Sequence, residues 1–335
     1  MDIVDLDAAD PRTADEMWRL TAASYAHDRE GTPPPTEKSF RGRLAHTDTG
    51  ERHFRRGIWE GDRLVGYHTV TVFELENKDL AFLREVVDPA RRRRGLGQAL
   101  VEDALRVAGK AGRTRVLGFA YEQAEDGPDR SPAATRLKLK NGFRFNLREH
   151  SRMAPVAALG EEEERELFEE SVAASPGYRI RTWVGPCPED VIESFCRLFA
   201  KLLGEMPTGE LDLEDFQMTP ERQRGEERGF AARGMTLVTT VALDGDGEVA
   251  AITEYMVPAG VDYANQGMTL VDPAHRGRRL GTRVKIANLR RLREEAPEVE
   301  RLLTANAETN EHMNRINERL GFRSVEIDVE YLKEL

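Results

Sequence analysis

The turn that decides the fold reads Val86-Val87-Asp88-Pro89-Ala90-Arg91-Arg92-Arg93-Arg94-Gly95-Leu96-Gly97. An apolar strand pattern over 80–87 leads into it, and apolar residues at helical spacing over 96–108 follow it. Backbone N–H groups at such a helix start lack partners and carry partial positive charge, so they hold phosphate oxygens well. Glycine lets the backbone approach the anion, and arginine adds forked donors. The stretch therefore predicts a phosphate-binding loop between a strand and a helix.

The spacing within this loop excludes two common nucleotide-binding motifs. It has neither the Gly-x-Gly-x-x-Gly spacing of dinucleotide-binding folds nor the Gly-Lys-Ser/Thr ending of a Walker loop. The chain as a whole is acidic, with 49 basic and 60 acidic residues and a formal net charge of −11. A nucleic-acid-binding surface usually makes its domain basic, so we expect no nucleic-acid partner. The short basic clusters at 91–94 and 276–279 favour a small anionic ligand instead.

A second copy of the turn lies 184 residues further along the chain, measured from Gly97 to Gly281. It begins Leu270-Val271-Asp272-Pro273-Ala274-His275 and continues into an Arg cluster and Leu-Gly. The later Gly-Phe pair at 142–143 also returns, at 321–322. Because these features recur in the same order at nearly the same offset, the sequence indicates an internal duplication.

Each half predicts the same order of elements. In the first half the apolar patterns predict a helix at 14–26, strands at 53–59, 64–73 and 80–87, a helix at 96–108, a strand at 115–119, a helix near 132–139 and a strand from 143. In the second half they predict a helix at 189–203, strands at 236–242, 248–257 and 263–271, a helix at 280–295, a strand at 301–306, a helix at 311–320 and a strand at 322–329. The fold class is therefore α/β, with a mixed sheet flanked by helices in each half.

Length and composition agree with two domains. At roughly 150 residues per domain, 335 residues predict two, and 39% hydrophobic residues supply their cores. We expect domains at 1–153 and 178–335, joined by a linker at 154–177 whose acidic run 161–164 forms a solvated helix.

Several classes of protein are excluded by the same data. No run approaches the ~18 apolar residues of a membrane span, and residues 1–5 do not resemble a secretory signal. The two cysteines, Cys187 and Cys196, cannot build a disulfide framework or a four-ligand zinc site. We expect a cytoplasmic protein with no metal and no membrane contact.

The loop resembles the pyrophosphate loop of the GNAT superfamily of N-acetyltransferases. That loop reads Arg/Gln-x-x-Gly-x-Gly/Ala, and Arg92–Gly97 matches it in full. The second copy, Arg276–Gly281, keeps the first Arg and the last Gly, but Arg279 stands where the family has its first glycine. The second half is also similar to an actinobacterial tandem subgroup over 275–288 and 306–322. The resemblance covers about residues 1–150 and 178–335.

This resemblance implies two tandem GNAT-like domains, each a mixed, mostly antiparallel twisted sheet flanked by helices. It implies an acetyl-CoA-dependent N-acetyltransferase that acetylates the amine of a small molecule, as a monomer or homodimer. Two alternatives stay open. One or both halves bind CoA without catalysis, or the acceptor is a lysine of a protein.

The resemblance also implies a set of cofactor-binding residues. They lie at the ends of the fourth strands, in the two loops and helix starts, and in the polar segment 306–317. These residues are Val86, Val87, Arg92, Arg93, Arg94, Gly95, Leu96, Gly97, Gln98, Leu270, Val271, Arg276, Gly277, Arg278, Arg279, Leu280, Gly281, Thr282, Asn306, Asn310 and Asn317. A backbone N–H near Val86 or Leu270 is implied as the donor to the reaction's oxyanion.

Acyl transfer to an amine needs a base, and two acidic residues are candidates. Glu254 stands in an otherwise apolar strand, either on the solvent face or in the cleft as the base, and Glu85 is the equivalent candidate in the first half. The family often uses a Tyr four residues before the Gly-Phe glycine to reprotonate the leaving thiolate. That position is Lys138 in the first half and Asn317 in the second, so the acid is left unassigned.

The two halves differ in what they offer to catalysis. The first keeps the intact loop, which predicts the higher CoA affinity. The second carries more polar cleft candidates: Glu254, Asn306, Glu308, Asn310 and Asn317. Buried polar groups cost stability unless they are used or paired, so we favour catalysis in the second half, with Glu254 as the base. Tyr255, on the other face of the strand, and Cys196 are expected in the core.

Overall fold

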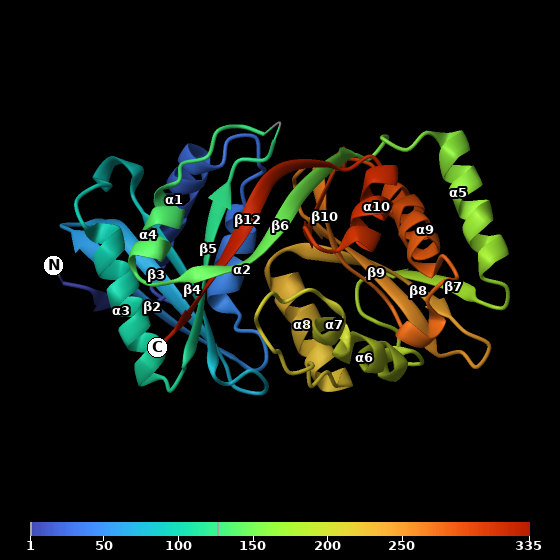
Figure 1. The fold of residues 1–335 in the computed structure, drawn as a ribbon, viewed down its shortest axis with the longest axis horizontal. Coiled ribbons are helices and arrows are strands. Elements are labelled where there is room, and N and C mark those ends of the chain that lie inside the picture. The colour runs from blue at the N-terminus through green and yellow to red at the C-terminus, as the bar shows by residue number, and fades with distance from the viewer. Residues whose placement is uncertain (1, 126) are drawn as a thin grey trace. The chain divides into compact units, whose positions relative to one another are not determined.

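The computed structural model describes residues 2–125 and 127–335, which form two compact units (Figure 1). The first unit comprises Met1–His150, Thr208–Glu214 and Ser324–Leu335, and the second comprises Ser151–Pro207 and Asp215–Arg323. Each unit contains a mixed, mostly antiparallel sheet flanked by helices, so the predicted fold class is confirmed.

The sheet of the first unit has the strand order β1-β2-β3-β4-β5-β12. Neighbouring strands are antiparallel except β4 and β5, which run parallel. The strands are β1 (Val4–Asp5), β2 (Glu51–Glu60), β3 (Arg63–Phe73), β4 (Leu80–Val87), β5 (Arg115–Glu122) and β12 (Arg323–Glu334). β6 (Arg144–Pro155) runs past His150, where the division between the units falls.

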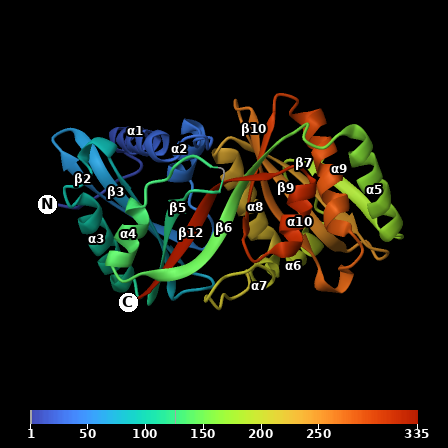
Figure 2. The same ribbon diagram turned by 45° about the horizontal axis from the view of Figure 1, so that its top comes forward.

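Helices cover both faces of this sheet. They are α1 (Pro11–Asp28), α2 (Glu37–Ala45), α3 (Leu96–Lys110) and α4 (Ala133–Lys140). Successive side chains of β3 point to opposite faces: Leu64 packs with Met17 of α1, and Val65 packs with Leu100 of α3. Figure 2 shows α1 and α2 on one face of the strands and α3 and α4 on the other. The carboxylate of Asp10 caps α1 by accepting a hydrogen bond from Thr13 N–H at 3.0 Å.

The second unit repeats this arrangement with the strand order β11-β10-β9-β8-β7. The strands are β7 (Arg179–Val184), β8 (Met235–Leu243), β9 (Val249–Pro258), β10 (Tyr263–Val271) and β11 (Arg301–Ala307), with β10 and β11 parallel. One face carries α9 (Leu280–Glu295), α5 (Glu161–Ala174) and α10 (Glu311–Arg319). The other face carries α6 (Ile192–Ala200), α7 (Leu202–Glu205) and α8 (Pro220–Ala232).

The acidic segment 161–164 begins a helix, as expected, but the helix is not merely solvated. α5 packs along α9, where Leu167 enters the apolar core of the second unit. Glu164 is buried and accepts hydrogen bonds from Arg290, at 2.7 Å, and from Arg293. Its charge is therefore held by two guanidinium groups on the neighbouring helix.

The last predicted strand, 322–329, corresponds to β12, and it belongs to the first unit. β12 pairs antiparallel with β5 from Ile327↔Glu122 to Glu334↔Arg115. The two units thus differ from the expected boundaries 1–153 and 178–335, because the first unit takes its strand beside β5 from the far end of the sequence. The local pattern of a strand does not specify which neighbour it will pair with.

A buried ion cluster holds β12 in the first unit. The carboxylate of Glu326 is fully buried and accepts hydrogen bonds from Arg130 Nε, at 2.6 Å, and from Arg29. Further along the strand, Val329 and Tyr331 enter the apolar core with residues of β3, β4 and α3. Leu211, from the segment Thr208–Glu214, packs beside Leu332.

Candidate active site

The first glycine-containing loop leaves the start of α3 open. After the 3-10 turn η1 (Pro89–Arg91), Arg93 and Gly95 adopt left-handed backbone conformations, with φ of 63° and 84°. No side chain caps α3, and a Cβ added to Gly95 would have no heavy atom within 4 Å. Arg93 and Arg94 are exposed and form no ion pair among the described residues. An uncapped helix start beside two free guanidinium groups fits a phosphate-containing ligand.

Arg92 has a different environment from the other arginines of this loop. Its guanidinium donates to both carboxylate oxygens of Asp28, at 2.5 and 2.6 Å, and to the Ser24 hydroxyl at 3.1 Å. Arg92 therefore joins the loop to α1 in this structure.

The second loop has the same backbone shape with its residues exchanged. Gly277 and Arg279 have φ of 78° and 53°, so glycine stands where the first loop has Arg93 and arginine where it has Gly95. Arg279 pairs with Glu170 of α5, and Arg276 pairs with Glu205 of α7. The guanidinium groups of Arg276 and Arg279 are thus held by carboxylates, while the uncapped helix start at α9 is retained.

The parallel strands beside each loop pair over only part of their length. β4 and β5 pair from Leu80↔Arg115 to Leu83↔Gly118. β10 and β11 pair from Tyr263↔Arg301 to Asn265↔Leu303. The remaining residues of each pair diverge, which leaves one edge of Val86, Val87, Leu270 and Val271 without a strand partner. Such an edge can hydrogen-bond to the amides of an extended ligand.

A β-bulge distinguishes the second unit from the first. Between Gln266↔Tyr255 and Thr269↔Thr253, the two residues Gly267 and Met268 of β10 lie opposite Glu254 alone. β4 shows no such interruption, because its register with β3 is continuous from Ala81↔Val72 to Val87↔Gly66. Bulges occur often beside active sites, where they redirect backbone and side-chain groups.

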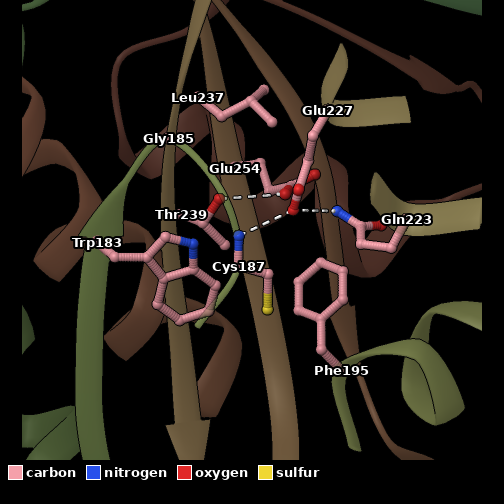
Figure 3. A pocket seen from close by; sticks show the side chains of 9 residues that line it. All are labelled: Trp183, Gly185, Cys187, Phe195, Gln223, Glu227, Leu237, Thr239 and Glu254. Carbon is pink, nitrogen blue, oxygen red and sulfur yellow. Dashed lines mark hydrogen bonds between the residues drawn. The ribbon is translucent and has the colours of Figure 1, made fainter. Parts of the chain in front are cut away.

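Glu254 lies in a pocket on the α6 and α8 face of the second-unit sheet (Figure 3). Glu254 accepts a hydrogen bond from Thr239 Oγ1 at 3.1 Å, and burial raises the pKa of its carboxyl to about 7. It is thus a carboxylate whose base strength suits neutral pH. The lining residues are Trp183, Gly185, Cys187, Phe195, Gln223, Glu227, Leu237, Thr239 and Glu254.

A second carboxylate, Glu227 of α8, faces Glu254 in this pocket (Figure 3). It accepts hydrogen bonds from Cys187 N–H at 2.8 Å, Gln223 Nε2 at 3.2 Å and Arg224 at 2.7 Å. Its negative charge adds to burial in raising the pKa of Glu254, because two nearby carboxylates disfavour ionisation of one of them.

The other predicted base, Glu85, is part of an ion pair. Its carboxylate accepts a hydrogen bond from the ammonium group of Lys138, whose side chain is fully buried. The strand registers also correct its equivalence with Glu254. Glu85 of β4 lies opposite His68 of β3, and Thr269 of β10 lies opposite Thr253 of β9 in the same way. Glu85 therefore corresponds to Thr269 and not to Glu254. The offset of 184 residues between the two copies already aligns Glu85 with Thr269, so the equivalence with Glu254 was wrong at the level of the sequence as well.

The polar segment 306–317 forms a connected network in the second unit. Asn317 donates through Nδ2 to Asn306 Oδ1 and accepts from Lys285 Nζ at 3.0 Å. Asn310 caps α10, since its side-chain oxygen accepts from Met313 N–H at 3.2 Å. The structure thus brings Asn306 and Asn317 together and gives Asn310 a helix-capping contact.

The remaining predicted residues lie at the two helix starts. Leu96 and Leu280 are buried, so their side chains serve the core. A Cβ at Gly97 would meet Leu137 Cδ2 at 3.2 Å, which shows how closely α3 packs against α4. Gln98 hydrogen-bonds Glu102 and Asn141, each at 2.7 Å. Gly281 and Thr282 occupy the first turn of α9, and Arg278 hydrogen-bonds the Ala274 carbonyl at 3.0 Å.

The sequence analysis missed several residues of the pocket. Glu227 and Gln223 lie on α8, a helix that the sequence analysis did not predict. α8 has no apolar stripe, because the side chains that it buries include the polar residues Arg222, Gln223 and Glu227. The signal that could have located the helix is Thr219 as N-cap followed by Pro220 at the first position. Trp183 lies at the pocket wall and packs partly against the apolar cluster of α6. Tyr255 and Cys196 are buried, as predicted.

Within residues 2–125 and 127–335, none of the helices has the length and apolar character that crossing a bilayer requires.

Comparison with known proteins adds a family and several relatives. Residues 14–143 match the model of the acetyltransferase (GNAT) family. The chain is 28% identical to mycothiol acetyltransferase of Nocardia farcinica, over 96% of this chain and 94% of that protein. It is 29% identical to mycothiol acetyltransferase of Saccharomonospora viridis, over 91% of each. A solved tandem GNAT protein from the clavulanic acid biosynthesis pathway is similar with a TM-score of 0.82 and 26% identity, covering 99% of this chain and 98% of that one.

Proposed function

Because the chain belongs to the GNAT family of acetyltransferases, we propose that it transfers an acetyl group from acetyl-CoA to the amine of a small molecule, with the reaction in the second unit. The family membership supports the activity, and relatives named mycothiol acetyltransferases support a small-molecule acceptor. The assignment to one unit is argued below from the contacts of the two candidate bases.

The structure fits acetyl-CoA at both loops. In the first unit the open start of α3 would hold the phosphates through backbone N–H groups at Gly95 to Gly97, with Arg93 and Arg94 beside it. In the second unit the uncapped start of α9 would do so, with Arg276, Arg278 and Arg279 beside it. Bound there, acetyl-CoA supplies an activated acyl group as a thioester. The free edges of β4 and β10 would hydrogen-bond its amide-containing arm.

Glu254 is the proposed base. An amine acceptor is mostly an ammonium ion at neutral pH, and it must lose a proton before it can attack a carbonyl carbon. Glu254 takes that proton, directly or through one water molecule. A pKa of about 7 suits this step, because the carboxylate is substantially ionised at neutral pH and still holds a proton well. Glu227, held by three donors, keeps the pocket negative and so favours a cationic acceptor.

One observation carries the assignment to the second unit: Glu254 lies in a pocket opposite a bulge in β10, with a threonine hydroxyl as its hydrogen-bond partner. Glu85, in contrast, lies on a strand without a bulge and neutralises the buried Lys138. A carboxylate that already pairs with an ammonium group is a poor proton acceptor, because the positive charge stabilises its ionised form. The backbone N–H groups of β10 near Leu270, close to the bulge, are the proposed donors to the oxyanion.

The first unit is proposed as a CoA-binding unit without catalysis of its own. Its loop is open and carries two arginines, Arg93 and Arg94, that form no ion pair among the described residues. Its candidate base, Glu85, is already paired with Lys138. A duplicated enzyme can keep one copy for the reaction while the other is retained for binding or structure.

The test is a free-thiol assay with acetyl-CoA and a panel of amines that includes small aminated molecules and a lysine peptide. We expect turnover with a small amine, a loss of about 10²-fold or more in kcat/KM for Glu254→Gln, and little change in CoA affinity. The loss should shrink at high pH, where the amine deprotonates without help. The matched control is Glu85→Gln. Full activity of Glu254→Gln with a large loss in Glu85→Gln would assign catalysis to the first unit. Turnover of the lysine peptide and of none of the small amines would show that the acceptor is a protein lysine.

A further inference from the structure

Lys285 is a buried lysine in the second unit with one hydrogen-bond partner. Its side chain is 2% exposed, and Nζ donates to Asn317 Oδ1 at 3.0 Å. Lys285 lies one helical turn after Gly281, on the same face of α9. At Gly281 an added Cβ would meet Val271 of β10 at 3.6 Å and Ile316 of α10 at 3.8 Å. Lys285 therefore faces the space between the end of β10 and α10.

The first unit also buries a lysine in this region, but there the lysine forms a salt bridge. There the corresponding helix position is the buried Val101, and the ammonium group comes from Lys138 of α4, the counterpart of Asn317. Lys138 pairs with Glu85 of β4, whose counterpart in the second unit is Thr269. Both units thus place a lysine amine near the diverging strands, but only the first provides a carboxylate for it.

Among the described residues Lys285 forms no salt bridge, and its printed hydrogen bond is to the amide oxygen of Asn317. Glu164 of α5 pairs with Arg290 and Arg293, and Glu170 of α5 pairs with Arg279. Glu254 lies on β9 and bonds Thr239, on the opposite face of the sheet. Burial alone lowers the pKa of Lys285, to about 7. A buried ammonium group without an anion is costly, so it either loses its proton or meets an anion during function.

The network around Lys285 reaches the gap between the diverging strands. Asn317 connects Lys285 to Asn306, and Asn306 lies on β11 three residues after Leu303, where pairing with β10 ends. Glu254 approaches the same region from the other face, opposite the bulge of β10. Glu254 and the side-chain amine of Lys285 thus lie on opposite sides of the gap between the diverging strands, where the thioester-bearing arm of acetyl-CoA would lie.

We propose that Lys285 is the acid of the reaction: its ammonium group donates a proton to the sulfur that leaves as the amide forms. The proposal rests on the acetyl transfer proposed above for the second unit. As the C–N bond forms and the C–S bond breaks, the sulfur takes the bond's electron pair and a proton from Lys285 Nζ. Glu254 takes the proton released by the attacking nitrogen, after passing the first ammonium proton to solvent. Lys285 regains its proton from Glu254 through solvent, so one proton is released per turnover.

Binding of two CoA analogues tests the proposal without requiring the acceptor. The parent is Gly95→Asp, which blocks the first loop and leaves the second available. Calorimetry at pH 6, where the amine of Lys285 is protonated, compares CoA with desulfo-CoA, which lacks the sulfur. If Lys285 interacts with the sulfur, CoA binds at least about tenfold more tightly, as expected for a charge-assisted hydrogen bond. Lys285→Met should abolish the preference while the affinity for desulfo-CoA stays unchanged.

The matched control is the double variant Glu85→Gln/Lys138→Met, which removes both partners of the buried pair in the first unit. It should retain the preference for CoA. Circular dichroism checks folding, and Lys285→Gln replaces Lys285→Met if the latter does not fold. Equal affinity for CoA and desulfo-CoA in the parent, or a preference that survives in the folded Lys285 variant, would overturn the role of Lys285. Failure of either ligand to bind the second loop would overturn the proposed function of this unit, and the proposal with it.

Discussion

Replacing Glu254 with Gln should stabilise the protein at neutral and alkaline pH while it removes activity. Glu254 has a pKa of about 7 in the folded protein, against an ordinary value of 4.5, because burial disfavours its charged form. Gln has nearly the same shape and can keep a hydrogen bond to Thr239 without carrying a charge. The substitution therefore removes the cost of a buried carboxylate and little else.

The size of the effect follows from the raised pKa. The folded protein binds this proton more tightly than the unfolded chain does, so stability falls as pH rises from about 4.5 through about 7 and then levels off. The full difference corresponds to about 3 kcal/mol, and about 2–3 kcal/mol of it develops between pH 5 and pH 8. The Glu254→Gln variant has no carboxyl group to ionise at this position, so its stability does not fall with pH for this reason. Its stability relative to the parent should therefore rise by that amount over the same range.

The assay is urea denaturation of both proteins at pH 5, 6, 7 and 8, followed by the fluorescence of Trp183 with Trp18 and Trp59 of the first unit replaced by Phe in both proteins. The slope with respect to urea must match between the two proteins, so that the midpoints report stability. Glu85→Gln is the control, because the pairing of its carboxylate with Lys138 predicts a loss of stability instead. A stability difference between Glu254→Gln and the parent that stays constant from pH 5 to pH 8 would refute the raised pKa and, with it, the fitness of Glu254 as a base.

Three further changes probe other parts of the molecule. Gly95→Asp should abolish CoA binding at the first loop without unfolding the chain, since it places a carboxylate at the open start of α3; calorimetry showing unchanged stoichiometry would contradict this. Glu85→Gln should destabilise the first unit by about 3–5 kcal/mol, because it leaves the ammonium group of Lys138 buried without its anion; an unchanged urea midpoint would show that the pair contributes nothing. Glu326→Ala should destabilise the same unit by a similar amount, about 3–5 kcal/mol, because Arg29 and Arg130 lose their shared carboxylate, and thermal unfolding measures the loss.

Much of the fold could be predicted where an apolar pattern is bounded by clear turns. β4, β10 and α9 begin and end at the predicted residues. Their periodicity is strong, and Asp-Pro or Gly marks the neighbouring turns. α8 lacks that signal, because it buries polar side chains that bond to one another and to the backbone. Without α8, its Glu227 could not be placed beside Glu254.

The candidate site was predictable in its loops and less so in its contacts. The repeated motif located both loops, but the left-handed conformations of Arg93 and Arg279 were not predicted, because no local pattern marks them. The pairing of Glu85 with Lys138 joins residues 53 positions apart, on different elements, and no local pattern specifies it. The same holds for Lys285 and Asn317, which are 32 positions apart.

The position of β12 in the first unit reverses the usual order of folding along a chain. Domains generally fold one after another as the ribosome makes them, the earlier residues first. Here β12 stands between β5 and β6, so the sheet of the first unit stays interrupted until residues 323–334 have been synthesised, after all of the second unit. The residues made first are therefore among the last to reach their final structure. During translation their apolar strands are exposed for the time needed to make the second unit, which makes this interval the one in which chaperones would matter most for this protein.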